Sequence, residues 1–319
     1  MNADRASITA RLIAAATVMR QHAEISVDSP PSGAAHWCEQ FLATNRMDRL
    51  LLWSVRSVLG KALWQFIESI TVPGIVSHWM RRKRAIEDLV RAAAAEGFTQ
   101  LVVLGAGLDT LAFRLANEHL FETIISTDHP ATLEVVRAAI VSNSDYSASA
   151  SSNVARNGVC TDESQTRSLE LLSMDLACDD ACWILTNSRG FDETRSTVIV
   201  IEGVLMYLPE VAVADLLRSL AKVHTPRMRI VASWMNTTPG DPIGFVGQSR
   251  RIPEWLRRRG EPMLWSSTPV ALPMFLAELR WVNARIIDIA EMPSLKSNAS
   301  YGLKGEQLVV VERVGTKSL

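Results

Sequence analysis

The chain has 319 residues, of which 48% are hydrophobic and 21% are charged. Its 33 basic and 34 acidic residues nearly cancel, which excludes a global electrostatic field that would hold a nucleic acid or an anionic membrane. The hydrophobic fraction excludes a wholly disordered chain and is sufficient for one large α/β domain or two modest ones.

The cysteines and the N-terminus indicate a reducing compartment. Cys38, Cys160, Cys178 and Cys182 show no disulfide-framework spacing, and no histidine stands near the last two to complete a zinc site. No long apolar stretch with a small-residue cleavage site opens the chain, and arginine or lysine interrupts every longer apolar window. We therefore expect a cytoplasmic protein with no membrane segment and no metal site.

Helical periodicity dominates the first hundred residues. Over residues 7–22 and 36–98, large apolar side chains recur every three or four positions. The Pro73-Gly74 pair predicts a turn just before a helix over about 76–95. We predict that residues 1–97 form a helical cap with the helices on the acceptor side of the site.

From Gln100 onward, short strands alternate with helices. The predicted parallel strands are QLVVLG (100–105), TIISTD (123–128), LELLSMD (169–175), STVIVIE (196–202) and MRIVASW (228–234). Strands rich in Val, Ile and Leu that are separated by helices predict a doubly wound α/β sheet. The Ser- and Asn-rich segment 141–168 predicts a long surface loop.

Two strands close the chain without a helix between them. WVNARIIDIAEM (281–292) and EQLVVVERV (306–314) predict an antiparallel hairpin at the end of the sheet. The expected fold is a mostly parallel, Rossmann-like sheet of seven strands with this hairpin. Residues 98–319 would form this cofactor-binding core, with a lid insertion near 236–268.

A glycine turn follows the first strand. A dinucleotide site would need a third glycine where Thr110 stands, which disfavours an NAD-dependent oxidoreductase. The Gly105-Ala106-Gly107 turn still permits close backbone approach, which suits a ligand without a diphosphate, such as S-adenosylmethionine. A purely structural corner, or a non-catalytic nucleoside-binding module, remains the alternative.

Acidic residues end the next two strands. Asp128 is placed to accept hydrogen bonds from ribose hydroxyls, although it could equally start a turn before Pro130. Asp175 is placed to accept from an adenine amine while Leu176 supports the ring, with Met174 beside it, although a helix cap is as good a reading.

The fourth strand ends on Glu202, in a buried run where a carboxylate needs a partner. That partner could be a cofactor ammonium or an arginine from the helices. In HWMRRKRAIEDL, Arg82 is the candidate for gripping a cofactor carboxylate through two hydrogen bonds, against the alternative of a solvated helix face. Tyr207 is placed to line the acceptor side, or simply to pack. His129 would face the cofactor, and neither it nor His224 is a convincing catalytic base.

Five segments together resemble the leucine carboxyl methyltransferase family, which includes the phosphatase carboxyl methyltransferase and bacterial polyketide O-methyltransferases. They are RKRAIEDL, QLVVLGAGLDTLAFRL, STDHPATLEVVR, LLSMDL and VIVIEGVLMYLPE, which span about residues 80–223. The resemblance implies a class I methyltransferase fold. It also implies that S-adenosylmethionine is bound at the glycine turn, at the ribose, adenine and methionine positions, by Gly105, Asp128, Asp175, Leu176, Glu202 and Arg82.

The acceptor is left open by this resemblance. Similar sequences carry arginine after the GLDT stretch, where this chain has Leu111. We expect an O-methyltransferase of natural-product-like secondary metabolism, acting on a small-molecule or peptidyl carboxylate. A carboxylate is already ionised at neutral pH, whereas the alternative, a hydroxyl or phenol acceptor, needs a base. The arginines at 250–251 and 257–259 could pair with such a carboxylate or form a solvated face.

Overall fold

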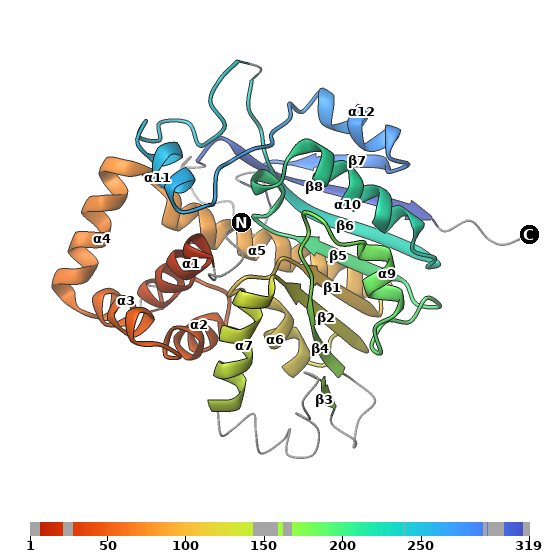
Figure 1. The fold of residues 1–319 in the computed structure, drawn as a ribbon, viewed down its shortest axis with the longest axis horizontal. Helices are drawn as coiled ribbons and strands as arrows, with labels where there is room; N and C mark the ends of the chain where they lie inside the picture. Colours follow the sequence, from red (N-terminus) through yellow and green to blue (C-terminus); the bar gives the residue numbers. More distant parts are fainter. Residues whose placement is uncertain are drawn as a thin grey trace, which may run out of the picture.

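The computed structural model describes residues 7–21, 28–142, 159–161, 168–238, 240–289, 292 and 303–314. Helices cover both faces of one twisted sheet, and the first helices lie to one side of it (Figure 1). The strands are β1 (Gln100–Leu104), β2 (Thr123–Asp128), β3 (Val159–Thr161), β4 (Ser168–Ser173), β5 (Thr197–Ile201), β6 (Arg227–Met235), β7 (Val282–Ile287) and β8 (Glu306–Val314).

The sheet confirms the predicted doubly wound class. Its described strands run in the order β3-β4-β2-β1-β5-β6-β8-β7. Strands β4, β2, β1, β5 and β6 are parallel, with Val102 level with Ile125 on one side and Ile199 on the other. Strand β8 lies antiparallel between β6 and β7, which confirms the C-terminal hairpin.

One strand was not expected. The three-residue β3 pairs antiparallel with β4 at the sheet edge, so eight strands are described where seven were predicted. It falls in the segment 141–168 that the composition predicted as a loop. The ends of that segment were also predicted wrongly, because residues 141–142 belong to α7 and residue 168 to β4. Residues 143–158 and 162–167 lie outside the described residues.

The segments predicted to be helical are helical in the structure, but they are divided into more helices than the periodicity indicated. The helices are α1 (Ile8–Met19), α2 (Ala34–Leu42), α3 (Arg46–Arg56), α4 (Val58–Thr71), α5 (Ile75–Ala95), α6 (Leu111–Asn117), α7 (Pro130–Ser142), α9 (Ala181–Thr186), α10 (Glu210–Lys222), α11 (Ile252–Arg258), α12 (Ala271–Glu278) and the 3-10 helix η1 (Leu205–Tyr207). Periodicity over 36–98 becomes four helices because caps divide it. The Asn45 and Ser57 side chains accept from the amides of Asp48 and Gly60 at the starts of α3 and α4.

The period-two alternation of β1 divides the core into two layers. Leu101 and Val103 join the cluster formed with α1, α2, α5, α6 and α7, whereas Val102 and Leu104 join the cluster formed with α9, α10 and α12. Burial on both faces explains why β1 is an unbroken apolar run. Among the described helices, none combines the length and the apolarity that crossing a membrane requires.

Candidate functional site

A cavity of about 210 Å³ opens where the parallel strands end, against α1 and α5. Open α/β sheets bind ligands at this edge, where loops leave the carboxyl ends of the strands. The structure brings together at this one cavity all eleven residues predicted to bind the cofactor or to line the acceptor side at the strand ends: Arg82, Gly105, Ala106, Gly107, Asp128, His129, Met174, Asp175, Leu176, Glu202 and Tyr207.

The glycine turn after β1 forms one wall of the cavity. Gly105 has φ of 65°, and a Cβ there would lie 2.6 Å from Val204 Cγ2 and 3.2 Å from Leu176 Cδ1. Gly107 has φ of 61°. The turn therefore has both the left-handed backbone and the lack of space that only glycine satisfies at the first position.

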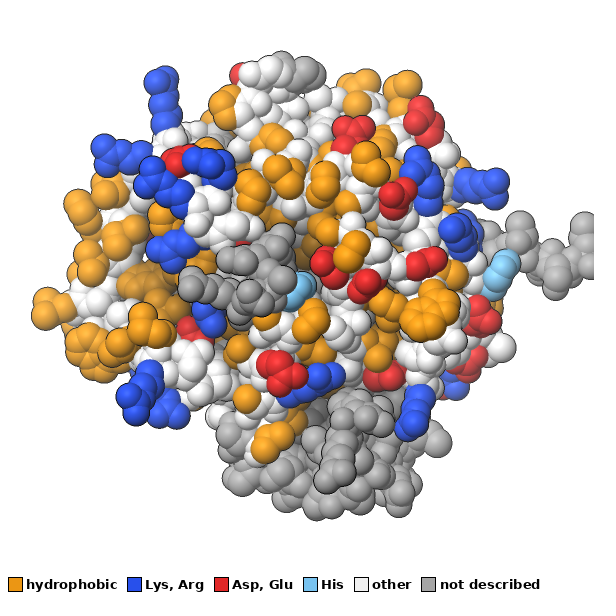
Figure 2. Space-filling model, viewed as in Figure 1, with side chains coloured by type: hydrophobic (Ala, Val, Ile, Leu, Met, Phe, Trp, Pro, Cys, Tyr) orange, Lys and Arg blue, Asp and Glu red, His pale blue; other side chains and the backbone are white. Residues whose placement is uncertain are grey.

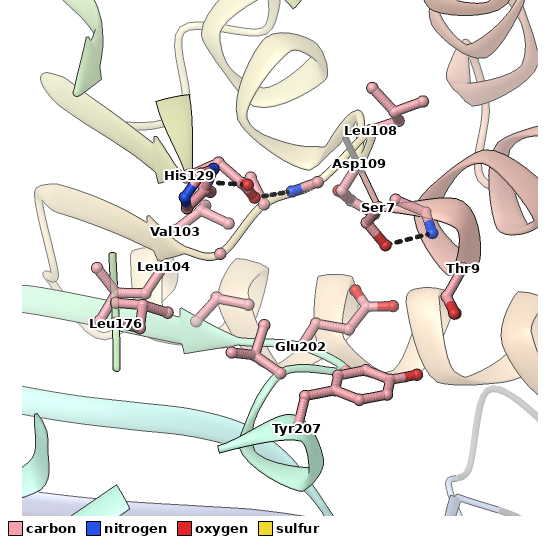
Figure 3. Close-up of a pocket in the computed structure, with 18 of the residues that line it drawn as sticks. Ser7, Thr9, Val103, Leu104, Leu108, Asp109, His129, Leu176, Glu202 and Tyr207 are labelled. Atoms are coloured by element: carbon pink, nitrogen blue, oxygen red, sulfur yellow. Dashed lines mark hydrogen bonds between the residues drawn. The ribbon is translucent and has the colours of Figure 1, made fainter. Parts of the chain in front are cut away.

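The Asp128 carboxylate is tied to this turn. One oxygen accepts from the Gly107 amide and the other accepts from the His129 amide at 2.7 Å (Figure 3). Burial raises the pKa of Asp128, and the two amides offset part of that rise because they stabilise the ionised form. From the end of β2, the Asp128 side chain thus fixes the glycine turn that follows β1, and its carboxyl group lies at the cavity wall.

Arg82 holds two carboxylates at once. Its guanidinium donates to both Glu306 oxygens at 2.8 Å and, from Nε, to Glu202 Oε1 at 3.0 Å. His78 Nε2 lies 2.8 Å from Glu306 on the other side. Burial alone would raise the pKa of Glu306, but the facing Arg82 and His78 lower it to about 2. Of the two partners expected for Glu202, the structure shows the arginine from the helices.

Lys83 continues this ion network into the cavity. Its Nζ pairs with Asp109 and lies 3.2 Å from Glu202 Oε1. The two carboxylates raise the pKa of Lys83 against the opposing effect of its burial, and Lys83 lowers the pKa of Asp109. The second Asp109 oxygen accepts from the Leu111 amide at 2.6 Å at the start of α6. The basic run on α5 therefore faces inward at two successive positions.

Tyr207 and α1 form the opposite wall. The Tyr207 ring lies beside Glu202 with its hydroxyl toward Thr9 (Figure 3). Glu261 accepts from the Ile8 amide at 2.7 Å, from the Thr9 amide at 3.2 Å and from the Thr9 hydroxyl at 2.5 Å. A carboxylate from the segment after α11 thus stabilises the N-terminus of the helix that covers the cavity.

The remaining nominated residues lie nearer β2 and β4. Met174 and Leu176 are buried, and Asp175 is half-buried and accepts from the Ala177 amide at 3.0 Å. His129 lies across the cavity from Tyr207 (Figure 3), and its Nδ1 faces the Ala131 amide at 3.4 Å. In the described part of the chain, no group of three His, Cys, Asp or Glu residues is placed to hold a metal ion.

Several lining residues carried no usable signal in the sequence. Thr9, Ala10 and Ile13 come from α1 and Ser7 caps that helix, in a part of the chain that is remote in sequence from every motif. Lys83 could have been found, because it adjoins Arg82 in the basic run. The arginines of α11 favour the solvated alternative, since Arg257 and Arg258 are mostly exposed and pair with Glu254.

Comparison with known proteins identifies a family whose model matches this chain. Residues 17–221 match the family model described as leucine carboxyl methyltransferase. Two proteins named "Putative S-adenosyl-L-methionine-dependent methyltransferase" are similar. One, from Mycobacterium ulcerans, is 30% identical over 56% of this chain and 52% of its own length; the other, from Mycolicibacterium smegmatis, is 31% identical over 57% and 53%. The chain thus spans about half the length of these relatives.

Two crystal structures share the fold. One, described as a putative methyltransferase from Thermobifida fusca, aligns with a TM-score of 0.55 over 81% of this chain and 90% of its own. A DUF574 family protein from Streptomyces avermitilis aligns with a TM-score of 0.53 over 79% and 89%. Both are 15% identical in sequence, so the likeness extends to the fold alone.

Proposed function

The chain belongs to the leucine carboxyl methyltransferase family, and from this premise we propose that it transfers a methyl group from S-adenosylmethionine to an oxygen of an acceptor. The observation that carries the proposal is the single cavity at the strand ends, which all eleven nominated residues line. A structural corner would not need five chain segments to converge on open space.

The charged side chains that line the cavity suit this cofactor. Four carboxylates line it, from Asp109, Asp128, Asp175 and Glu202, against the two cations Arg82 and Lys83. This excess of negative charge favours a ligand that carries a sulfonium and an ammonium group.

Roles follow for the individual residues. We propose that Asp128 holds the ribose hydroxyls and that the Gly105–Gly107 turn lies against the nucleoside. Asp175 would accept from the adenine amine, with Met174, Leu176 and His129 around the ring. Glu202, oriented by Arg82, would meet the methionine end.

The chain's own task is positioning. S-adenosylmethionine supplies a methyl group on a positively charged sulfur, so an in-line displacement needs alignment of the acceptor oxygen more than acid–base chemistry. The apolar side chains of Ile13, Leu108 and Leu264 line the cavity beside these polar groups and exclude water from it. Helix α1, fixed by Glu261, covers the same space.

A carboxylate is the acceptor that this lining suits. Glu202 and Asp109 are paired with cations, and Asp128 accepts hydrogen bonds from two backbone amides. Burial raises the pKa of Tyr207 to about 12, which keeps its phenol protonated. Carboxylates engaged in this way favour an acceptor that is already ionised over one that needs a base. The family model's description supports the same choice.

The lining of the cavity also supports the predicted roles of the N-terminal and C-terminal parts of the chain. We propose that residues 1–97 supply the cap and acceptor-side helices and that 98–319 form the cofactor-binding core. Within the core, the segment near 236–268 acts as a lid, because Glu261 and Leu264 reach α1 and the cavity.

Experiments with labelled S-adenosylmethionine test both the binding of this cofactor and the chemical class of the acceptor. We expect calorimetry to show binding to the wild type and at least tenfold weaker binding to Asp128→Asn. With a panel of small-molecule and peptidyl carboxylic acids, label on the acceptor should be released by mild alkali, as a methyl ester requires. Alkali-stable label would indicate an ether or amine product, and a lack of cofactor binding would overturn the methyltransferase assignment itself.

A further inference from the structure

Helix α4 presents an apolar face to solvent. None of its 14 residues is buried. Leu59, Leu63, Phe66 and Ile70 are 85%, 57%, 61% and 58% exposed. In Figure 2, hydrophobic side chains gather at the left edge of the molecule, where Figure 1 places α4.

The other face of α4 is its attachment to the molecule. Trp64 donates its indole N–H to Ser54 of α3 at 3.1 Å, and the Glu68 carboxylate accepts from the Val76 amide at 3.1 Å. Lys61 and Glu68, the only charged residues of α4, are half-buried on this side. The exposed stripe therefore carries no charge, and a contiguous apolar surface of this kind marks a site of association.

The spacing of the stripe reads the same in both directions. Leu59, Leu63, Phe66 and Ile70 follow one another at intervals of 4, 3 and 4 residues, which is the spacing of a knobs-into-holes seam. A second copy of α4, related by a twofold axis and running antiparallel, would place Leu59 against the partner's Ile70 and Leu63 against the partner's Phe66. Such a self-complementary patch is what an isologous interface requires.

The area available matches a stable dimer. Met47, Leu50 and Trp53 on the adjoining α3 are 74%, 61% and 70% exposed, and Val58 and Ile67 on α4 are 84% and 47% exposed. With the four stripe residues, these side chains offer on the order of 1,000 Å² of apolar surface, whereas a standard interface buries about 800 Å² per partner. A membrane-surface helix would carry lysines or arginines along its polar face, and α4 has one lysine.

From the uncharged stripe, its symmetric spacing and its area, we propose that the chain forms a homodimer through antiparallel packing of α4 on α4. The proposed interface lies apart from the cofactor cavity, because no residue of α3 or α4 lines that cavity. The proposal is therefore independent of the proposed methyl transfer.

Sedimentation velocity on the full chain tests the dimer. The wild type should sediment at twice the chain mass at micromolar concentration, and L63E/F66E, which places like charges across the axis, should sediment as a monomer. The matched control V211E/M274E changes two residues that are 71% and 65% exposed on α10 and α12, and it should stay dimeric. A monomeric wild type, or a dimer that persists in L63E/F66E with unchanged circular dichroism, would overturn the proposal.

Cross-linking tests the register without destabilising charges. In a C160S/C178S/C182S background, L59C/I70C should be joined into dimers by a short bis-maleimide. L59C alone should not, because its two cysteines would lie roughly 16 Å apart along the paired axes. Equal cross-linking of both variants would refute the antiparallel register. A monomeric wild type that binds vesicles of anionic phospholipid, with binding lost in L63E/F66E, would assign the stripe to a membrane surface instead.

Discussion

The Ile8 amide donates to the Glu261 carboxylate at 2.7 Å, across 253 positions of sequence. This contact fixes the first turn of the helix that covers the proposed cofactor cavity. We expect Glu261→Gln to weaken the cap by about 1 kcal/mol, because the charge at a helix N-terminus is lost while one acceptor oxygen is kept. Hydrogen exchange of residues 8–13 should accelerate severalfold, whereas Glu254→Gln, on exposed α11, should leave it unchanged.

Gly105→Ala should abolish tight cofactor binding. The substitution forces a left-handed backbone on alanine and places a methyl group 2.6 Å from Val204 Cγ2. Gly97→Ala is the matched control, because its φ is 91° but nothing lies within 4 Å of its Cβ position. Both variants should lose about 1 kcal/mol from backbone strain. Only Gly105→Ala should lose more than tenfold in affinity by calorimetry, and equal affinity in the two variants would contradict this.

Cofactor affinity should depend on pH through Asp128. Its pKa is raised by burial in the free protein. Ribose hydroxyls would donate to the ionised form, so affinity should be full above this raised pKa and should fall as the pH drops below it. Calorimetry over a pH series would show the decline. Asp128→Asn should bind weakly at every pH without that dependence, and a parallel decline in both proteins would assign it to another group.

Glu306 should govern stability at low pH. Its folded pKa of about 2 lies below the ordinary 4.5, so the unfolded chain binds more protons between these values. The contribution of Glu306 is therefore complete above about pH 4.5 and is lost as the pH falls towards 2. Urea unfolding should show Glu306→Gln destabilised by roughly 3 kcal/mol at neutral pH, because Arg82 loses a buried partner. The acid limb of its stability curve, where the free energy of unfolding falls with decreasing pH, should be shallower than that of the wild type. An acid limb as steep as that of the wild type would disprove this assignment.

Tyr207→Phe separates an acceptor contact from simple packing. The phenol stays protonated well beyond neutral pH because burial raises its pKa to about 12. If its hydroxyl orients the acceptor, kcat/KM for the acceptor should fall about tenfold while the Kd of S-adenosylmethionine is unchanged. Unchanged kinetics would leave Tyr207 a packing residue against Thr9.

The sequence predicted the sheet well because its signals are local. Strands β1, β2 and β5 are buried on both faces, and each candidate ligand follows a strand directly, so chain order alone placed Asp128, Asp175 and Glu202 at one edge. The glycine turn could be read for the same reason. A class of fold and a set of neighbouring residues follow from such patterns without any knowledge of long-range contacts.

The partners of those residues could not be read in this way. Nothing in the local pattern connects Arg82 with Glu306, 224 positions later, or Thr9 with Glu261. The helical periodicity of residues 36–98 predicted that Leu63 and Phe66 share a helix face, but it did not reveal that this face is left uncovered. Periodicity identifies an apolar face, whereas only tertiary packing determines what lies against it.

The position of Glu306 has a consequence for biosynthesis. Arg82 emerges from the ribosome long before β8, which delivers its buried counter-charge and fills the gap between β6 and β7. A nascent chain that lacks β8 would leave Arg82 without its Glu306 partner and would expose an open sheet edge along β6. Completion of the pocket therefore has to wait until β8 has been synthesised and has paired with β6.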